Sequence, residues 1–97
     1  MKSREEYIDI LRRNSDVIRH EFGVSSLCLF GSVARGEQHE GSDVDVCVEM
    51  PPKMFAVIGL KRFLEDILNS SVDVVRVHKG LNPFLQSEIK RDGIYLI

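Results

Sequence analysis

Apolar residues recur along the chain with two different periods, and each period predicts a different kind of element. A helix is expected from Ser3 to Gly23, because Ser3 and Glu6 form a capping-box pattern and glycine commonly ends a helix. Its apolar stripe consists of Tyr7, Leu11, Val17, Ile18 and Phe22. The next segment, 24–30, is short, mostly apolar and closed by Gly31, so we expect a largely buried strand.

The segment 43–48 alternates strictly between valine and other residues, which is typical of a strand with two different faces. Its three valines would share one face. The opposite face would carry Asp43, Asp45 and Cys47. Side chains two residues apart on a strand are separated by about 6 to 7 Å. Two carboxylates are therefore expected to point to the same side of this strand.

The second half of the chain alternates between helix and strand. Pro51-Pro52 ends the preceding strand, and apolar residues then recur at helical spacing over 54–68. These apolar residues are Met54, Val57, Ile58, Leu60, Phe63, Leu64, Ile67 and Leu68. We expect a strand at 72–77, a helix at 82–93 that opens on Asn-Pro and closes on Gly, and a short last strand at 94–97.

This order of elements predicts an α/β (α+β) fold. A single small mixed β-sheet with helices packed against it accommodates all of them. The chain has 97 residues, which suits one domain, so residues 1–97 are expected to form a single domain.

Charge and hydropathy exclude two classes of partner. The 13 basic and 15 acidic residues give a net charge of −2, so no general binding to nucleic acid is expected. No apolar run approaches the roughly 18 residues that suggest a membrane-spanning helix, and the first residues contain no apolar leader. We therefore expect a cytoplasmic protein. Cys28 and Cys47 stand singly among aliphatic neighbours and are expected to be buried, reduced thiols.

Two short motifs carry the candidate chemistry. Gly31-Ser32 follows a predicted strand, where a turn or short helix presents free backbone N–H groups and a hydroxyl, as phosphate-binding loops do. Asp43 and Asp45 repel each other unless a cation lies between them, and oxygen ligands of this kind suit Mg²⁺ together with phosphates. Each motif alone is weak, because Gly-Ser is also a common turn and Asp-x-Asp is also a solvated strand face. Their combination is specific.

The combination of Gly31-Ser32, ten residues, and then Asp43-Val44-Asp45 resembles the signature of the nucleotidyltransferases related to DNA polymerase β. The fuller runs, 30–36 and 42–45, look most like the minimal nucleotidyltransferases, which are proteins of about this length. The resemblance covers essentially the whole chain and implies the polymerase β-like nucleotidyltransferase fold.

The resemblance implies roles for individual residues. Asp43 and Asp45 would be catalytic and would hold two Mg²⁺ ions that bridge the triphosphate of ATP. Gly31 and Ser32 would bind the terminal phosphates.

A third catalytic carboxylate is expected on a later strand. Asp73 is the only acidic residue in 72–77, and it would serve as a metal ligand, as the acceptor of the proton from the attacking hydroxyl, or as both. Arg35 follows Ser32 by three residues and would either neutralise phosphate charge or remain an ordinary surface arginine.

The function that the resemblance implies is Mg²⁺-dependent transfer of AMP from ATP to an acceptor hydroxyl, with release of pyrophosphate. A chain of 97 residues leaves no room for a substrate-holding domain, so the acceptor is expected to bring its own surface. Minimal nucleotidyltransferases typically act as antitoxins that attach AMP to a HEPN-domain ribonuclease toxin. A HEPN-type toxin is therefore the expected partner. The alternative is a binding module that holds a nucleotide or a partner without turnover, and the three carboxylates argue against it.

Overall fold

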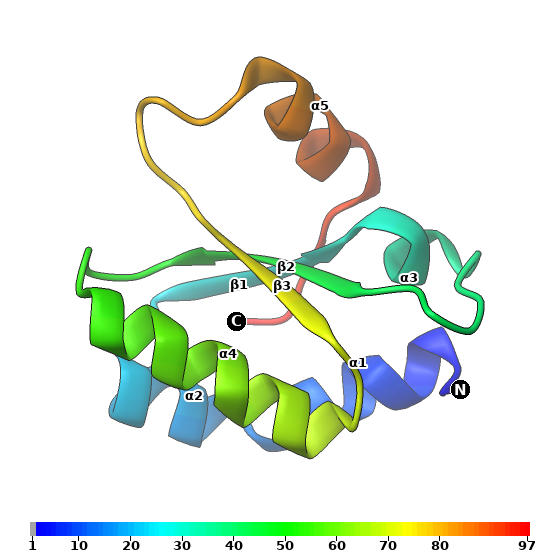
Figure 1. Cartoon of the computed structure of the whole chain (residues 1–97), viewed down its shortest axis with the longest axis horizontal. Helices are drawn as coiled ribbons and strands as arrows, with labels where there is room; N and C mark the ends of the chain where they lie inside the picture. The colour runs from blue at the N-terminus through cyan, green and yellow to red at the C-terminus, as the bar shows by residue number, and fades with distance from the viewer. Residues whose placement is uncertain (1) are drawn as a thin grey trace.

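The computed structural model describes residues 2–97, which form one four-stranded sheet with helices on both faces (Figure 1). In chain order the elements are α1 (Arg4–Arg13), α2 (Ser15–Phe22), β1 (Ser26–Phe30), α3 (Gly31–Arg35), β2 (Val44–Glu49), α4 (Met54–Leu68), β3 (Val72–Arg76), α5 (Pro83–Asp92) and β4 (Ile94–Tyr95). The strand order is β3-β2-β1-β4. β1 is antiparallel to β2 and β4, whereas β2 and β3 are parallel. The predicted mixed sheet and fold class are confirmed.

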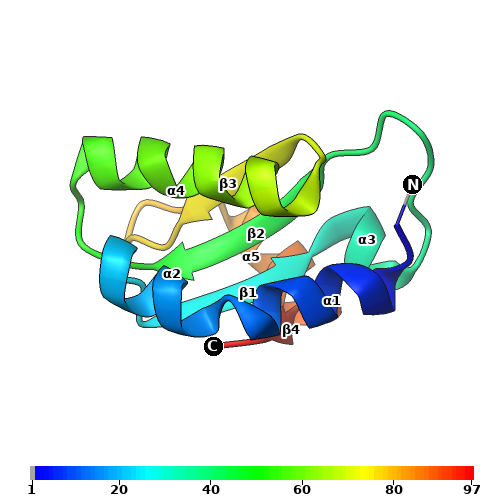
Figure 2. The same cartoon turned by 90° about the horizontal axis from the view of Figure 1, so that it is seen from below.

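Helices α1, α2 and α4 cover one face of the sheet and bury its main core (Figure 2). The valines of β2 point into this core, as their alternation predicts. The side chains that are fully buried here include Leu27, Leu29, Val44, Val46 and Val48 from the sheet and Tyr7, Leu11, Ile18, Leu60, Leu64 and Leu68 from the helices. Because this apolar layer is continuous, it holds the strands in register.

The opposite face of the sheet is covered by α5 and is buried less completely. A small apolar cluster joins it to α5 and consists of Cys28, Phe30, Cys47 and Ile89. The two cysteines lie directly opposite each other on β1 and β2. Both are free and buried, as predicted. Burial raises the pKa of Cys47 to about 11, so it remains a protonated thiol at neutral pH.

The N-terminal helix predicted as one segment is two helices, so that prediction is wrong. The break lies at Asn14, whose side-chain amide donates to the Ile10 carbonyl at 2.8 Å. A local bond of this kind competes with regular helical hydrogen bonding. Ile18 is buried after the break, whereas Val17 is 40% exposed and does not belong to the core.

The other predicted elements are confirmed with shifts of one or two residues at their ends. The capping box between Ser3 and Glu6 is present. β2 begins at Val44, so Asp43 lies just before the strand and not within it. Within residues 2–97, no helix is long and apolar enough to cross a lipid bilayer.

The predicted apolar stripe of α4 is wrong at its first turns. Met54 is 73% exposed and Ile58 is 48% exposed, although both recur at helical spacing with the buried leucines. Periodicity alone does not distinguish them, because exposure depends on what lies beneath each turn. The first turns of α4 extend beyond the end of β2 (Figure 2).

Candidate active site

The predicted catalytic residues meet at one end of the sheet, on the face that α5 covers. β1 ends there and continues directly into α3, while β2 and β3 both begin there (Figure 1). The strand register pairs Phe30 with Asp45, and it pairs Asp45 with Asp73. Neighbouring strands lie about 4.8 Å apart, and residues paired in register point to the same face. The carboxylates of Asp45 and Asp73 are therefore neighbours beside the end of β1.

Gly31 makes room for the Asp45 carboxylate. Its backbone has φ +76°, and a Cβ added at this position would collide with Oδ2 of Asp45. Any other residue would therefore be strained and would displace the carboxylate. The need for glycine at position 31 therefore has a cause within the protein itself, the close approach of the Asp45 carboxylate.

The electrostatic environment of Asp45 is that of a carboxylate among like charges. Its pKa is raised from 3.8 to about 6. The main cause is burial of the carboxylate, and the negative charges of Asp73 and Asp43 add to it. Glu88 on α5 raises the pKa further, while Arg35 opposes the shift.

Asp45 and Asp73, with Asp43 nearby, offer carboxylate oxygens of the kind that a hard divalent cation shares with phosphates. Within residues 2–97, no salt bridge neutralises Asp43, Asp45 or Asp73. In the same described part, no group of three His, Cys, Asp or Glu side chains converges closely enough to hold a metal ion alone. Mg²⁺ commonly binds one or two carboxylates and takes its remaining ligands from water and substrate phosphates. The neighbouring carboxylates of Asp45 and Asp73 match this pattern.

Ser32 and Arg35 lie on α3, next to this cluster. Ser32 follows Gly31 in the first turn and is partly buried. The Arg35 guanidinium donates to Asp92 on α5 at 2.8 Å and to Glu37 at 3.2 Å. Arg35 therefore links α3 to α5, and its positive charge also reaches Asp45.

A polar hollow of about 270 Å³ opens at the same end of the sheet. Ser42, which directly precedes Asp43, and Ser71, which precedes β3, both line it. The Tyr7 hydroxyl reaches this hollow from α1 and is hydrogen-bonded to Ser70 Oγ at 3.0 Å. Hydroxyl groups therefore line this hollow, whereas Asp43, Asp45 and Asp73 do not line it.

Two acidic residues of α5 were not predicted as part of the site. Nothing in the sequence distinguishes Glu88 from an ordinary surface residue of an amphipathic helix. Asp92 does carry a signal, because a carboxylate in the last turn of a helix opposes the helix dipole. Ion pairs compensate for this: the guanidinium groups of Arg91 and then Arg35 hold the pKa of Asp92 below its usual value.

Comparison with known proteins assigns the chain to a family. Residues 8–96 match the family described as the nucleotidyltransferase domain. The protein adenylyltransferase MntA of Thermococcus cleftensis is 34% identical over 99% of this chain and 98% of its own length. A solved structure described as a candidate minimal nucleotidyltransferase has a TM-score of 0.77 and 32% identity, and the match covers 96% of this chain and 95% of the other.

A crystal structure of a toxin-antitoxin with AMP-PNP is also similar. It has a TM-score of 0.68 and 26% identity, and the match covers 99% of this chain and 73% of the other. The Gly-Ser and Asp-x-Asp motifs lie within the matched residues. On these grounds the chain belongs to the nucleotidyltransferase domain family, as its motif indicates.

Proposed function

We propose that this nucleotidyltransferase transfers AMP from ATP to a hydroxyl group of a protein, and that the protein is a HEPN-type toxin for which it acts as the antitoxin. One observation carries the proposal: Asp45 and Asp73 lie side by side on adjacent strands, next to the Gly31 turn from which α3 begins. This arrangement would place carboxylate ligands for metal ions beside the turn that is proposed to bind the triphosphate.

The proposed roles are those that the family resemblance implies for residues at these positions. Asp43 and Asp45 would hold two Mg²⁺ ions, which when bound would polarise the triphosphate and stabilise the attacking and leaving oxygens. Gly31 and Ser32 would bind the terminal phosphates through the uncapped first turn of α3. Asp73 would complete a metal site or accept the proton of the attacking hydroxyl.

Arg35 would bind phosphate only after a change of partners. Its guanidinium now donates to Asp92 and Glu37, and a triphosphate would have to compete with both carboxylates. Its charge would then stabilise the phosphate oxygens on which negative charge develops.

Three observations support a protein acceptor. The MntA relative is named a protein adenylyltransferase, and a similar structure is a toxin-antitoxin pair with an ATP analogue. Within the chain, residues 8–96 are taken up by the nucleotidyltransferase domain itself. Its net charge of −2 provides no general attraction for RNA.

Nucleotide binding is the first test. We expect ATP to bind only with Mg²⁺ or Mn²⁺, because three carboxylates repel a triphosphate in the absence of a cation. Calorimetric titration with and without EDTA measures this. Equal affinity under both conditions would contradict the two-metal proposal.

Transfer to protein is the second test. The chain is incubated with Mg²⁺ and α-labelled ATP, either with a purified HEPN-type protein encoded beside it or with host lysate. One small protein should become labelled and gain about 329 Da per AMP, as the transfer chemistry requires. Label found only in RNA or small molecules would contradict a protein acceptor, and ATP binding without any label would favour the binding module.

The role of Asp73 can be separated from that of the other two aspartates. Asp73→Asn should lower the rate of transfer far more than it weakens ATP binding, because proton acceptance belongs to the attacking step. Single-turnover rates and ATP titrations on the same variant measure both. A parallel loss of affinity would make Asp73 mainly a metal ligand, and unchanged kinetics would make it structural.

A further inference from the structure

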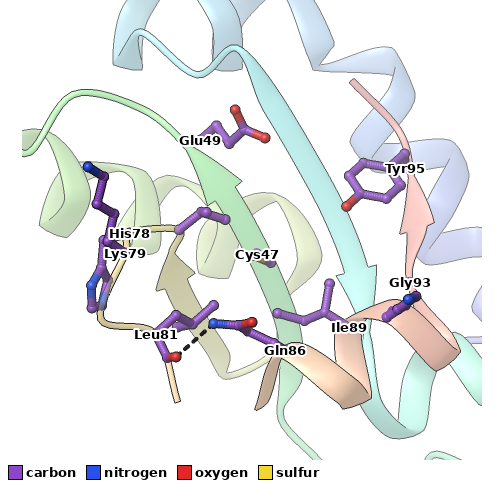
Figure 3. A pocket seen from close by; sticks show the side chains of 11 residues that line it. Cys47, Glu49, His78, Lys79, Leu81, Gln86, Ile89, Gly93 and Tyr95 are labelled. Carbon is purple, nitrogen blue, oxygen red and sulfur yellow. Dashed lines mark hydrogen bonds between the residues drawn. The ribbon is translucent and has the colours of Figure 1, made fainter. Parts of the chain in front are cut away.

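A second cavity lies on the α5 face of the sheet, outside the cluster of aspartates. It has a volume of about 520 Å³ and opens between α5, the end of β2, the segment that follows β3, and β4 (Figure 3). None of Asp43, Asp45, Asp73, Gly31 and Ser32 lines it. The cavity is therefore a separate feature that the proposed catalytic roles do not use.

The chemistry of this cavity is apolar at its base and basic at its rim. Its apolar lining includes Cys47 and Ile89, which belong to the small apolar cluster beneath α5, and Leu81, which packs against that cluster. Lys79 and Lys90 line it from two different elements. Figure 3 shows that Cys47 and Ile89 lie at its centre, with Lys79 toward its outer side.

The rim carries a surplus of positive charge. Glu49 is its single carboxylate, against the two lysines. His78 also lines the rim, and its Nδ1 accepts from the Gly80 N–H at 3.1 Å, so the ring is held in place within its loop. An occupant with an apolar body and one negative charge is complementary to this lining.

The cavity lies within reach of the catalytic centre along a single strand. Cys47 and Glu49 follow Asp45 by two and four residues and share its face of β2. A strand rises by about 3.3 Å per residue, which places them roughly 7 and 13 Å from Asp45 along the strand. A macromolecule that presents a hydroxyl group to the aspartates would extend over this distance.

Two exposed apolar side chains lie at the rim of the cavity. Tyr95 is 65% exposed and Val77 is 40% exposed, and both line it. A small ligand at the base of the cavity would leave much of these two side chains in water, whereas a protein surface would cover them. The surroundings therefore favour a protein over a free nucleotide.

We propose that this cavity anchors the acceptor protein by taking one of its apolar side chains, with a carboxylate of the acceptor next to that side chain paired with Lys79 and Lys90. This inference rests on the proposed protein acceptor and adds where the acceptor is held. Anchoring about 10 Å from the aspartates would orient the acceptor hydroxyl for attack on the α-phosphorus. The anchor acts in binding and not in the chemical step.

Charge reversal tests the lysines. The variant Lys79→Glu with Lys90→Glu is compared with Lys61→Glu with Arg62→Glu, which makes the same change in net charge on exposed positions of α4, beyond the opposite face of the sheet. The acceptor is the HEPN-type protein of the labelling assay. We expect the cavity variant to raise KM for the acceptor at least tenfold while KM for ATP and kcat stay within twofold, and we expect the α4 variant to change none of them.

A second variant tests the cavity itself without changing charge. Val77→Trp places a large side chain at a partly exposed position on the rim and should obstruct the cavity. It should raise the dissociation constant for the acceptor at least tenfold, measured by calorimetry without ATP. Thermal unfolding of each variant confirms that it is folded.

The outcomes separate this inference from the proposed function. If the acceptor binds to the wild-type chain and both cavity variants weaken that binding, the anchor is supported even if no AMP is transferred. Unchanged acceptor affinity in both folded variants would overturn it. A rise in KM for ATP would also overturn it, because the cavity would then hold the nucleotide. An equal effect of the α4 variant would overturn it as well, because the change in net charge alone would then explain the weaker binding.

Discussion

The two faces of the sheet use the same strands for different purposes. On the face covered by α1, α2 and α4, the valines of β2 and the leucines of β1 are fully buried in one continuous core. On the α5 face, the residues between them include Asp45, two cysteines and Phe30 around a much smaller apolar cluster. Alternate residues of β2 therefore face the main core, where they stabilise the fold, and the α5 face, where the candidate site lies.

The difference shows how a small protein tolerates mutual repulsion among the carboxylates of the candidate active site. Burial raises the pKa of Asp45, and the negative charges of Asp73, Asp43 and Glu88 raise it further, which means that the ionised carboxylate destabilises the metal-free fold. Apolar burial on the opposite face, which is nearly complete, offsets this loss of stability. If this division holds, substitutions of the aspartates on the α5 face should change activity without loss of stability. Substitutions in the main core should lower stability without changing activity.

The largest expected effect is on activity. Asp43→Asn with Asp45→Asn should lower transfer at least about a hundredfold, because the proposed metal ligands are removed. In EDTA at pH 7 the same variant should be as stable as the wild type or more stable, because like charges are relieved. Transfer assays and urea unfolding measure the two quantities, with the exposed Asp66→Asn on α4 as the control. Transfer at the native rate by this double variant would contradict the proposal that the α5 face carries the activity.

The contact between Gly31 and Asp45 can be tested with a matched pair of glycines. Gly31→Ala and Gly36→Ala both place alanine at positive φ, +76° and +71°, and each should cost about 1 kcal/mol or more of stability. Only the first collides with Asp45, since nothing lies within 4 Å of an added Cβ at Gly36. Gly31→Ala alone should therefore lower transfer, by at least about tenfold. Equal activity of the two variants would show that this approach does not position the carboxylate.

Neighbouring residues of β1 provide the corresponding comparison for stability. Leu29 faces the main core and Cys28 faces α5. Leu29→Ala should lower the free energy of unfolding by about 2 to 5 kcal/mol. Cys28→Ala removes a smaller side chain from a smaller cluster and should cost about 1 kcal/mol. Urea unfolding measures both, and similar costs would mean that the α5 face contributes as much to stability as the main core.

The smallest expected effect is a dependence of stability on pH. The pKa of Asp45 in the folded protein is about 6, above its ordinary value of 3.8, so the folded state binds this proton more tightly than the unfolded state. The free energy of unfolding should therefore fall as the pH rises from about 4 to 7, by about 1 to 2 kcal/mol, since solvent screens a partly exposed group. Urea unfolding in EDTA measures this contribution as the difference between wild type and Asp45→Asn. If the two pH profiles are parallel, Asp45 is not perturbed in the folded state.

Most of the fold could be predicted because its sequence signals are local. The capping box at Ser3 and the valine alternation of 43–48 are confirmed by the structure. The break at Asn14 could not be predicted from periodicity, because the apolar residues on both sides of it still fit one helical pattern. The choice there is made by a side-chain hydrogen bond that competes with the backbone pattern.

Some residues of the candidate site also have local sequence signals, whereas others do not. The motif residues are close together in sequence, and the pairing of two strands is enough to bring Asp45 beside Phe30 and Gly31. Glu88 and Asp92 come from a helix that reaches the site only through tertiary packing. Their positions depend on how α5 crosses the sheet, and no local pattern encodes that crossing.

The pairing of Phe30 with Asp45 also bears on how relatives of this chain can be recognised. The two halves of the motif are the two sides of a hairpin, joined by α3 and the exposed segment 36–43. The distance between the glycine and the carboxylate in space is set by strand register, whereas their separation in sequence is set by the length of this connection. Residues added to an exposed connection are tolerated, whereas one residue added within β2 would turn its aspartate toward the leucines. The interval of ten residues is therefore a property of the loop, and proteins with the same site are free to show a different interval.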